Sequence, residues 1–197
     1  MTKRAGTLVL TAALAFAIGS APSAVATATA TWTIHPGGSF SGTASDPVLK
    51  DLNTRSTFTC ATVTLTGTFK SGTGQANPIG KITGDTWTGC TGPGGVRIDM
   101  TDGNSVPWHM NAHTYTASTG TTHGTMSIGV GPAYGACTAG FIGTVNWAYT
   151  NSTHVLKITG SLDVTAAICP AGWVKRGDEV TITASAPISP AMTITSP

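Results

Sequence analysis

The sequence predicts an all-β protein: a single antiparallel sandwich or barrel of about 8–11 strands, stapled by two disulfides. Apolar and polar side chains alternate over short runs bounded by Gly, Asn, Asp and Ser, the pattern of half-buried strands. No long stretch repeats apolar residues at helical spacing. Four cysteines, an even number, follow what looks like an export signal, which indicates a disulfide-bridged extracellular domain.

The N-terminal segment has the three parts of a secretory signal peptide. A basic start, "MTKR", precedes the apolar run "AGTLVLTAALAFAIG" and a series of small residues. We expect cleavage after Ala26, with Ala28 and Ala30 as alternatives. A membrane anchor is disfavoured because the apolar run is shorter than the roughly 20 residues that span a bilayer. We therefore assign residues 1–26 to a removed signal peptide and 27–197 to one secreted β-domain without a transmembrane segment.

The charge of the mature chain excludes two classes of partner. The full sequence has ten Lys+Arg and eight Asp+Glu, and Lys3 and Arg4 leave with the signal, so the formal net charge becomes zero. Charged residues make up only 9% of the chain, against about 25% in ordinary globular domains. No cluster of Lys and Arg is present in the sequence to neutralise phosphates. We expect neither nucleic-acid binding nor polybasic membrane docking.

The first clear strand is "ATVTLTGTF" (61–69), which places Ala61, Val63, Leu65 and Phe69 on one face and threonines on the other. The segment 46–52 is either one helical turn, with Asp46 as cap and Pro47 at its first position, or a β-hairpin ahead of Cys60. Four other short runs alternate in the same way: 96–100, 145–149, 156–162 and 179–183.

Strand register selects one of the three cysteine pairings. A hairpin loop at 71–77 places Cys60 opposite Cys90, since antiparallel partners lie equally far from the turn. A turn at 150–154 brings Cys137 to within one residue of Cys169, and matching Trp147 with Ile158 requires a β-bulge before Cys169. We predict the disulfides Cys60–Cys90 and Cys137–Cys169. A zinc site is disfavoured because no two cysteines have the short spacing that it uses.

Three of the five histidines lie in "PWHMNAHTYTASTGTTHG" (107–124), which we interpret as a hairpin with its loop at 117–120. Trp108, Met110 and Ala112 alternate on one face of the first strand, and Met126, Ile128 and Val130 do so on the second. These apolar rows must share the core side. The opposite, solvated face then carries His109, Asn111, His113, Tyr115 and His123.

Strand geometry argues against a metal site on this hairpin. His109 and His113 are four residues apart, which on a strand spans about 13 Å. Only His113 and His123 could approach, as a cross-strand pair about 5 Å apart at Cβ. Two ligands without a nearby carboxylate bind a metal weakly. We regard His113 and His123 as weak metal candidates and expect no functional metal and no cofactor.

No catalytic constellation is recognisable in the sequence. The G-x-S-x-G elbow is missing. Asp99 precedes the "TDGN" turn and Asp102 lies in it, and Asp178 and Glu179 open a late strand, so turn formation accounts for them. We assign no catalytic residue and expect no enzymatic activity. The alternative is a secreted hydrolase using scattered carboxylates, which as a glycosidase would need two of them about 5–9.5 Å apart across a cleft.

Among the tryptophans, Trp173 is the best candidate for binding a ligand. It follows Cys169 on a predicted loop beside Lys175 and Arg176, and an exposed indole offers a large flat surface. The competing interpretation is a loop tryptophan that covers the end of the barrel. Trp87, which pairs with Val63 in the disulfide register, is predicted to belong to the core, as are Trp108 and Trp147.

Several pieces together resemble a family of secreted, disulfide-bridged, β-rich proteins of high-GC Gram-positive (actinobacterial) bacteria. They are "SGTASDPVLKDLNTRSTFTC", "GKITGDTWTGCTGPGG", "VPWHMNAHTYTASTG", "YTNSTHVLKI" and the terminal "TITSP", which span most of the mature chain. The resemblance implies export and a disulfide-bridged β-domain, and it brings no substrate or catalytic residue.

The sequence thus favours a secreted, non-enzymatic β-domain that has a binding or structural role at the cell envelope or with an extracellular partner.

Overall fold

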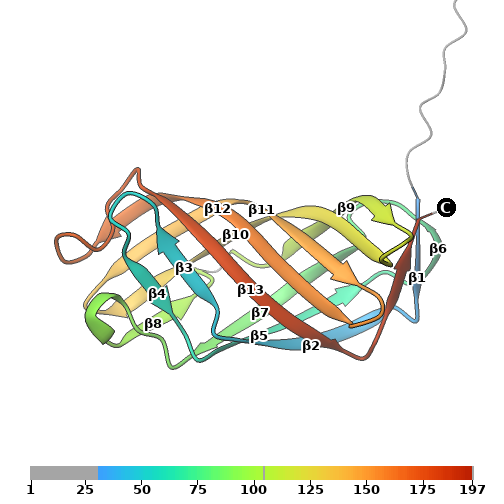
Figure 1. Cartoon of the computed structure of the whole chain (residues 1–197), viewed down its shortest axis with the longest axis horizontal. Helices are drawn as coiled ribbons and strands as arrows, with labels where there is room; N and C mark the ends of the chain where they lie inside the picture. The colour runs from blue at the N-terminus through green and yellow to red at the C-terminus, as the bar shows by residue number, and fades with distance from the viewer. Residues whose placement is uncertain (1–30, 104, 197) are drawn as a thin grey trace, which may run out of the picture.

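A computed structural model describes residues 31–103 and 105–196. Eight antiparallel strands form a closed barrel in the order β12-β11-β10-β9-β7-β5-β2-β13, and pairing of β12 with β13 closes it (Figure 1). This confirms the all-β prediction and selects the barrel over the sandwich. The strands are β2 (Gly38–Ser45), β5 (Thr62–Phe69), β7 (Gly80–Thr88), β9 (Trp108–Thr116), β10 (Thr121–Gly135), β11 (Thr138–Thr150), β12 (Val155–Ile168) and β13 (Glu179–Ser189).

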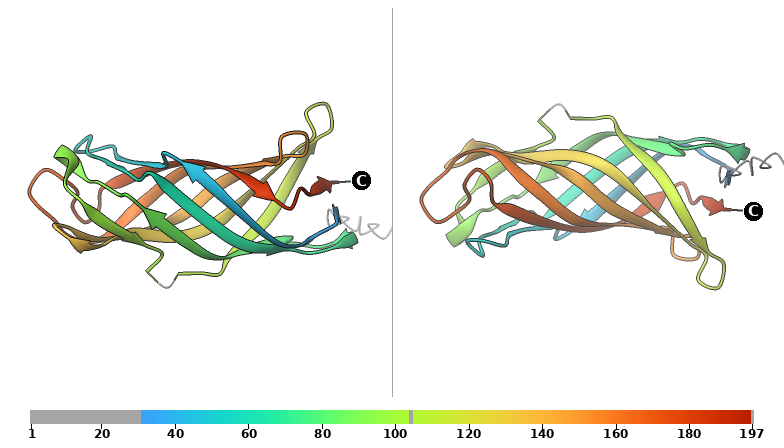
Figure 2. Two further views of the ribbon diagram at one scale, coloured as in Figure 1. Left: turned by 90° about the horizontal axis from the view of Figure 1, so that it is seen from below. Right: turned by 90° about the horizontal axis from the view of Figure 1, so that it is seen from above.

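Shorter strands extend the barrel at its two ends. The hairpin β3 (Val48–Asp51) and β4 (Thr57–Thr59) adds to β13, and β8 (Ile98–Thr101) pairs with β10. These strands and both disulfides lie at what we call the disulfide end, where a short 3₁₀ turn (Pro93–Gly95) also lies. A three-stranded sheet lies at the opposite end, the cap end (Figure 2). Its strands are β14 (Thr193–Thr195), β1 (Trp32–His35) and β6 (Gly72–Gln75).

The barrel encloses a core of side chains. Eight-stranded barrels have an interior just wide enough for side chains to fill. The largest fully buried ones here include Trp32, Phe58, Phe141, Trp147 and Tyr149. Exposed threonines face outward, and pairs on neighbouring strands join through their hydroxyls, as in Thr43–Thr64 at 2.9 Å. The inward apolar and outward threonine rows are the alternation that the sequence displays.

Most predicted strands occur near their expected positions. At one place the structure decides between two alternatives, and at another it differs from the expectation. The segment 46–52 belongs to a β-hairpin, not a helical turn. Ala61 is exposed, although Val63, Leu65 and Phe69 are buried as expected. Ala61 precedes β5, and its backbone bonds to Asp46 and Thr88 outside the regular alternation.

Both predicted disulfides form. Thr62 lies opposite Thr88 and Val63 opposite Trp87, which carries the ladder to the Cys60–Cys90 bond. On β11 and β12 the register is Phe141 with Val164 and then Gly140 with Ala166, so Thr165 is the bulge residue required to bring Cys137 to Cys169. Each bond thus staples one long hairpin at the disulfide end.

Candidate functional site

The structure places His109, His113 and His123 on the exposed outer face of β9 and β10. The apolar rows that begin with Trp108 and Met126 are buried on the other face, as the alternation predicts. His109 lies directly opposite Lys81 of β7. The predicted solvated histidine face is therefore present.

A bulge on β9 changes the second half of this hairpin. His123 lies opposite Thr114 and Gly124 opposite Ala112, so His113 is the extra residue. The expected cross-strand pair of His113 with His123 does not form, and His113 Nε2 instead contacts Thr125 Oγ1 at 2.8 Å. The bulge also reverses the faces beyond it. Tyr115, expected outside, lies opposite the fully buried Thr122 and packs against the core.

Within residues 31–103 and 105–196, no group of three or more His, Cys, Asp and Glu side chains could hold a metal ion. Replacing His109, His113 and His123 together by Thr should change the free energy of unfolding by no more than about 1 kcal/mol, because all three side chains are exposed. Micromolar zinc should leave the melting temperature of the wild type unchanged. A zinc-induced stabilisation that the triple variant lacks would contradict this expectation and reveal a metal site.

Trp173 covers part of the barrel at the disulfide end. Its ring meets Phe58 edge-on at 6.3 Å between centroids, and its backbone oxygen accepts a 2.6 Å hydrogen bond from Thr54 Oγ1. The indole of Trp173 lies directly over Gly92, where a Cβ atom would collide with the ring. Trp173 is half-buried and holds its loop on the barrel, while ligand binding by it stays a prediction.

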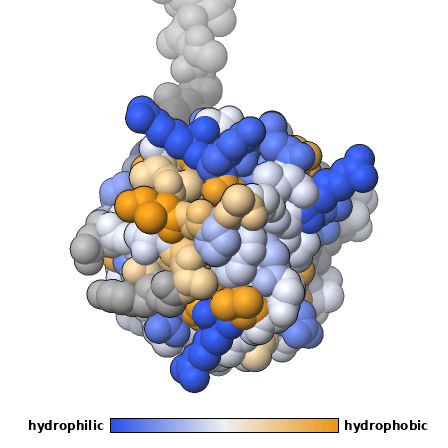
Figure 3. Space-filling view, turned by 90° about the vertical axis from the view of Figure 1, so that its left-hand side faces the viewer, coloured by the Kyte–Doolittle hydropathy of each residue, from blue (hydrophilic) through white to orange (hydrophobic). Residues whose placement is uncertain are grey.

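The surface of the disulfide end is mixed in polarity (Figure 3). Three of the four large apolar side chains that are exposed in the described residues, Leu52, Val96 and Ile168, belong to loops or strand ends there. Hydrophobic and weakly hydrophobic residues adjoin one another over part of the face shown, and the most hydrophilic ones lie mainly toward its rim.

Two aspartates, Asp85 and Asp102, form an acidic pair between β7 and the end of β8, which are not paired as strands in the barrel wall. β7 pairs with β9 only from Gly80 to Ile82. Further toward the disulfide end, Asp85 of β7 lies within hydrogen-bonding reach of Asp102, which follows β8. Asp85 lies opposite the buried Leu65, on the inner side of its strand. The pair thus closes the wall where backbone hydrogen bonds are missing.

Burial raises the pKa of Asp85 to about 6; the Trp87 indole, which donates a hydrogen bond to this carboxyl, opposes the rise, and the neighbouring Asp102 carboxylate adds to it. Asp85 Oδ1 is buried and has no N–H or O–H donor from another residue. Two carboxyl groups can share a hydrogen bond only when one carries a proton. Protonation of Asp85 removes the repulsion between the two carboxylates and permits a hydrogen bond between them.

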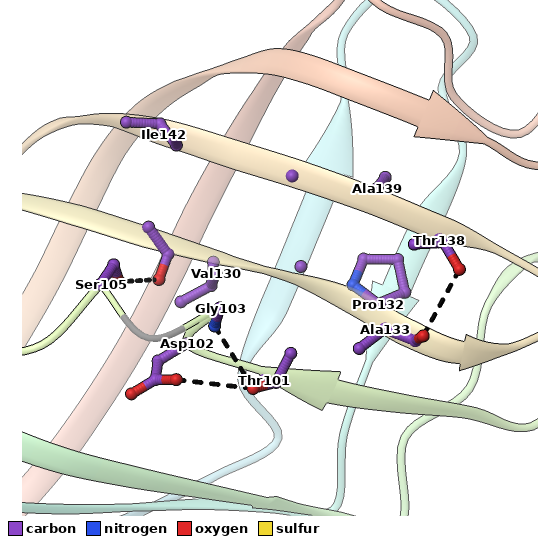
Figure 4. A pocket seen from close by; sticks show the side chains of 13 residues that line it. Thr101, Asp102, Gly103, Ser105, Val130, Pro132, Ala133, Thr138, Ala139 and Ile142 are labelled. Carbon is purple, nitrogen blue, oxygen red and sulfur yellow. Dashed lines mark hydrogen bonds between the residues drawn. The ribbon is translucent and has the colours of Figure 1, made fainter.

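A groove of about 280 Å³ lies on the outer wall beside Asp102 (Figure 4). Its floor is the backbone of β10 and β11, where Gly131 is in such close contact with Ala139 that no side chain could be accommodated. Ile142, 53% exposed, forms one edge, and Ser105 forms the other through a 2.6 Å hydrogen bond to Gly129 O. The Asp102 carboxylate points away from Ile142. Asp102 is thus one of the residues that line a mainly apolar groove, while Asp85 is not among them.

Charged side chains are segregated along the barrel. Strand β7 carries Lys81 near the cap end and Asp85 further toward Cys90, and β12 carries Lys157 before Asp163. By strand register, the half of the barrel nearer the cap end, which we call the cap half, holds three lysines and all five histidines, and none of the eight carboxylates of Asp and Glu side chains. The disulfide half holds those eight carboxylates and five cations. The cap-half groups are Lys70, Lys81, Lys157, His35, His109, His113, His123 and His154.

Sequence reasoning missed both the acidic pair and this segregation. An aspartate at an inward position of β7 was a detectable signal, since the disulfide register already aligned Trp87 with Val63 and therefore Asp85 with Leu65. The segregation depends on the direction in which each strand crosses the barrel, and no local pattern reports it.

No family model, no curated protein and no solved structure matches this chain. Among the described residues, no helix is long and apolar enough to cross a membrane.

Proposed function

We propose that this protein is an exported, non-enzymatic domain that binds at the cell envelope or to an extracellular partner through the outer wall of its barrel. The observation that carries the proposal is the charge segregation on the barrel. A cap half with lysines and histidines and without Asp or Glu side chains offers a surface for an anionic partner.

Two further features support it. Aromatic side chains occupy the barrel interior, so the ligand surface belongs on the outside. The two disulfides are typical of proteins from oxidising compartments, and they agree with the export signal expected at residues 1–26, which lies outside the described residues.

The second candidate is a secreted hydrolase, and the acidic pair is the observation that favours it. A carboxyl with a pKa raised to about 6 beside a second carboxylate is an arrangement that acid–base catalysis uses. The position of the acidic pair argues against a hydrolase. Asp85 is directed to the inner side of β7, and Asp102 points away from Ile142 across the groove.

One experiment separates the two functions. The purified protein is incubated with insoluble peptidoglycan, chitin and polyphosphate-coated resin, and both the retained protein and any released polymer fragments are measured. We expect retention on at least one polymer without fragments, and equal retention of Asp85→Asn. Fragments released by the wild type and not by Asp85→Asn would establish the hydrolase. The absence of both retention and fragments would contradict the binding function.

A further inference from the structure

Five exposed cationic or titratable side chains form one surface on the cap half, which we call the basic band: Lys81, His109, His113, His123 and Lys157. They lie on β7, β9, β10 and β12, and β11 completes this run of neighbouring strands. Lys81 is directly opposite His109. His123 is opposite Ala148, which is in turn opposite Lys157. The band therefore crosses five strands on the outer wall.

The spacing of the band suits an extended ligand. Neighbouring strands are about 4.8 Å apart, so the backbones at His123 and Lys157 are separated by roughly 10 Å. His109 and His113 are separated along β9 by at most about 13 Å. Lys81 and His109 are close enough to contact one small anion, but His123 with Lys157, or His109 with His113, are too far apart to do so. A linear polymer with a negative charge on each repeat can contact several of them in succession.

No carboxylate neutralises the band from the elements packed around it. β5 and β11 carry no Asp, Glu, Lys, Arg or His, and β9 and β10 carry only the three histidines of the band. Asp85 shares β7 with Lys81 but lies on the inner side. Asp163 shares β12 and lies six residues beyond Lys157, toward the disulfide end. The other Lys and His side chains of the cap half are Lys70, His35 and His154, and Tyr115 and Tyr149 lie on β9 and β11.

Three side chains of the band are imidazoles and two are lysine ammonium groups. Imidazole is the side-chain group whose charge ordinarily changes between pH 5 and 8. Affinity for a polyanion rises with each phosphate that a cationic side chain neutralises.

One observation favours a phosphate polymer over a lipid surface. A membrane-docking face inserts apolar side chains between headgroups, but the large exposed apolar residues of the described chain lie outside the band: Leu52, Val96, Ile142 and Ile168. We propose that the basic band binds a linear, phosphate-bearing polyanion and binds it more tightly in acid. This inference rests on the proposed binding function and names the ligand class.

The test uses long-chain inorganic polyphosphate carrying a fluorescent end label, with binding measured by anisotropy at pH 5.5 and 7.5. We expect affinity at least about tenfold higher at pH 5.5. The salt dependence of log K should steepen by about 2 at this pH, since three additional charges contribute about 0.7 each. His109→Gln/His113→Gln/His123→Gln should abolish the pH dependence. Lys81→Gln/Lys157→Gln should weaken binding at both pH values.

The matched control is Lys50→Gln/Lys175→Gln, which removes two exposed lysines from the disulfide half and should leave binding unchanged. Circular dichroism checks that each variant is folded. Polyphosphate binding that is absent, or that the triple Gln variant retains in full at pH 5.5, would overturn the proposal. Stronger binding to phosphatidylserine vesicles than to polyphosphate would overturn it in favour of a membrane. Retention on peptidoglycan or chitin without polyphosphate binding would leave the binding function standing and refute only this ligand.

Discussion

Replacing all four cysteines by alanine should lower the free energy of unfolding by about 7 kcal/mol. The cysteines of the two bonds are separated by 30 and 32 residues, and in the chain-entropy model loops of that length contribute about 3.5 kcal/mol each. Most domains have only about 5–15 kcal/mol in total. The quadruple variant is therefore expected to be largely unfolded at 37 °C, as urea denaturation followed by tryptophan fluorescence would show.

Each two-cysteine variant provides a control for the other. Cys60→Ala/Cys90→Ala affects the β5–β7 hairpin, and Cys137→Ala/Cys169→Ala affects β11–β12. Because the hairpins are separate, the two losses should be nearly additive. A loss below about 1 kcal/mol in either variant would show that its loop is already constrained in the unfolded chain.

Asp85→Asn should stabilise the protein at pH 7.5 by about 2 kcal/mol and have little effect at pH 4. The pKa of Asp85 is raised from 3.8 to about 6 in the folded protein. Between those values the folded state binds more protons than the unfolded state, so wild-type stability falls as the pH rises from about 4 to 6. The full shift corresponds to about 3 kcal/mol, which we reduce because the carboxyl is partly exposed. Asparagine imitates the protonated acid, since it accepts from Trp87 and donates to Asp102.

Melting temperatures from pH 4 to 7.5 test this expectation. Asp99→Asn is the matched control, because Asp99 is an exposed aspartate on neighbouring β8, and exposed substitutions change stability by about 0.5 kcal/mol or less. A variant Asp85→Asn that is less stable than the wild type at pH 7.5 would contradict the expectation and show that the ionised carboxylate has a stabilising role.

Much of the barrel was predictable because strand information is local. Alternation identified β5, β9 and β10 from their own residues, since successive side chains on a strand point to opposite faces. Turn position then specified register. Val63 with Trp87 and Trp147 with Ile158 followed from counting outward from two turns, and both disulfides depended on that count.

The sequence-based predictions were wrong where a β-bulge interrupts the count of residues from a turn. The bulge at His113 inserts one residue, so Tyr115 turns inward and His113 moves away from its expected partner, His123. A bulge leaves little trace in composition, because any residue that tolerates exposure can occupy it. The bulge at Thr165 was predictable only because the register from the turn on one side and the Cys137–Cys169 disulfide on the other required it.

By itself, the sequence determined the strands, the disulfide pairing and the outward position of His109, because each depends on alternation or on distance from a turn. Tertiary structure alone decided that the sheet closes as β12 meets β13. It also brought Asp85 to Asp102, and it gathered Lys81, the histidines and Lys157 on one half of the wall. These outcomes depend on which strands become neighbours and in which direction each crosses the barrel. Such long-range pairings arise from burial of the whole core, and no single segment encodes them.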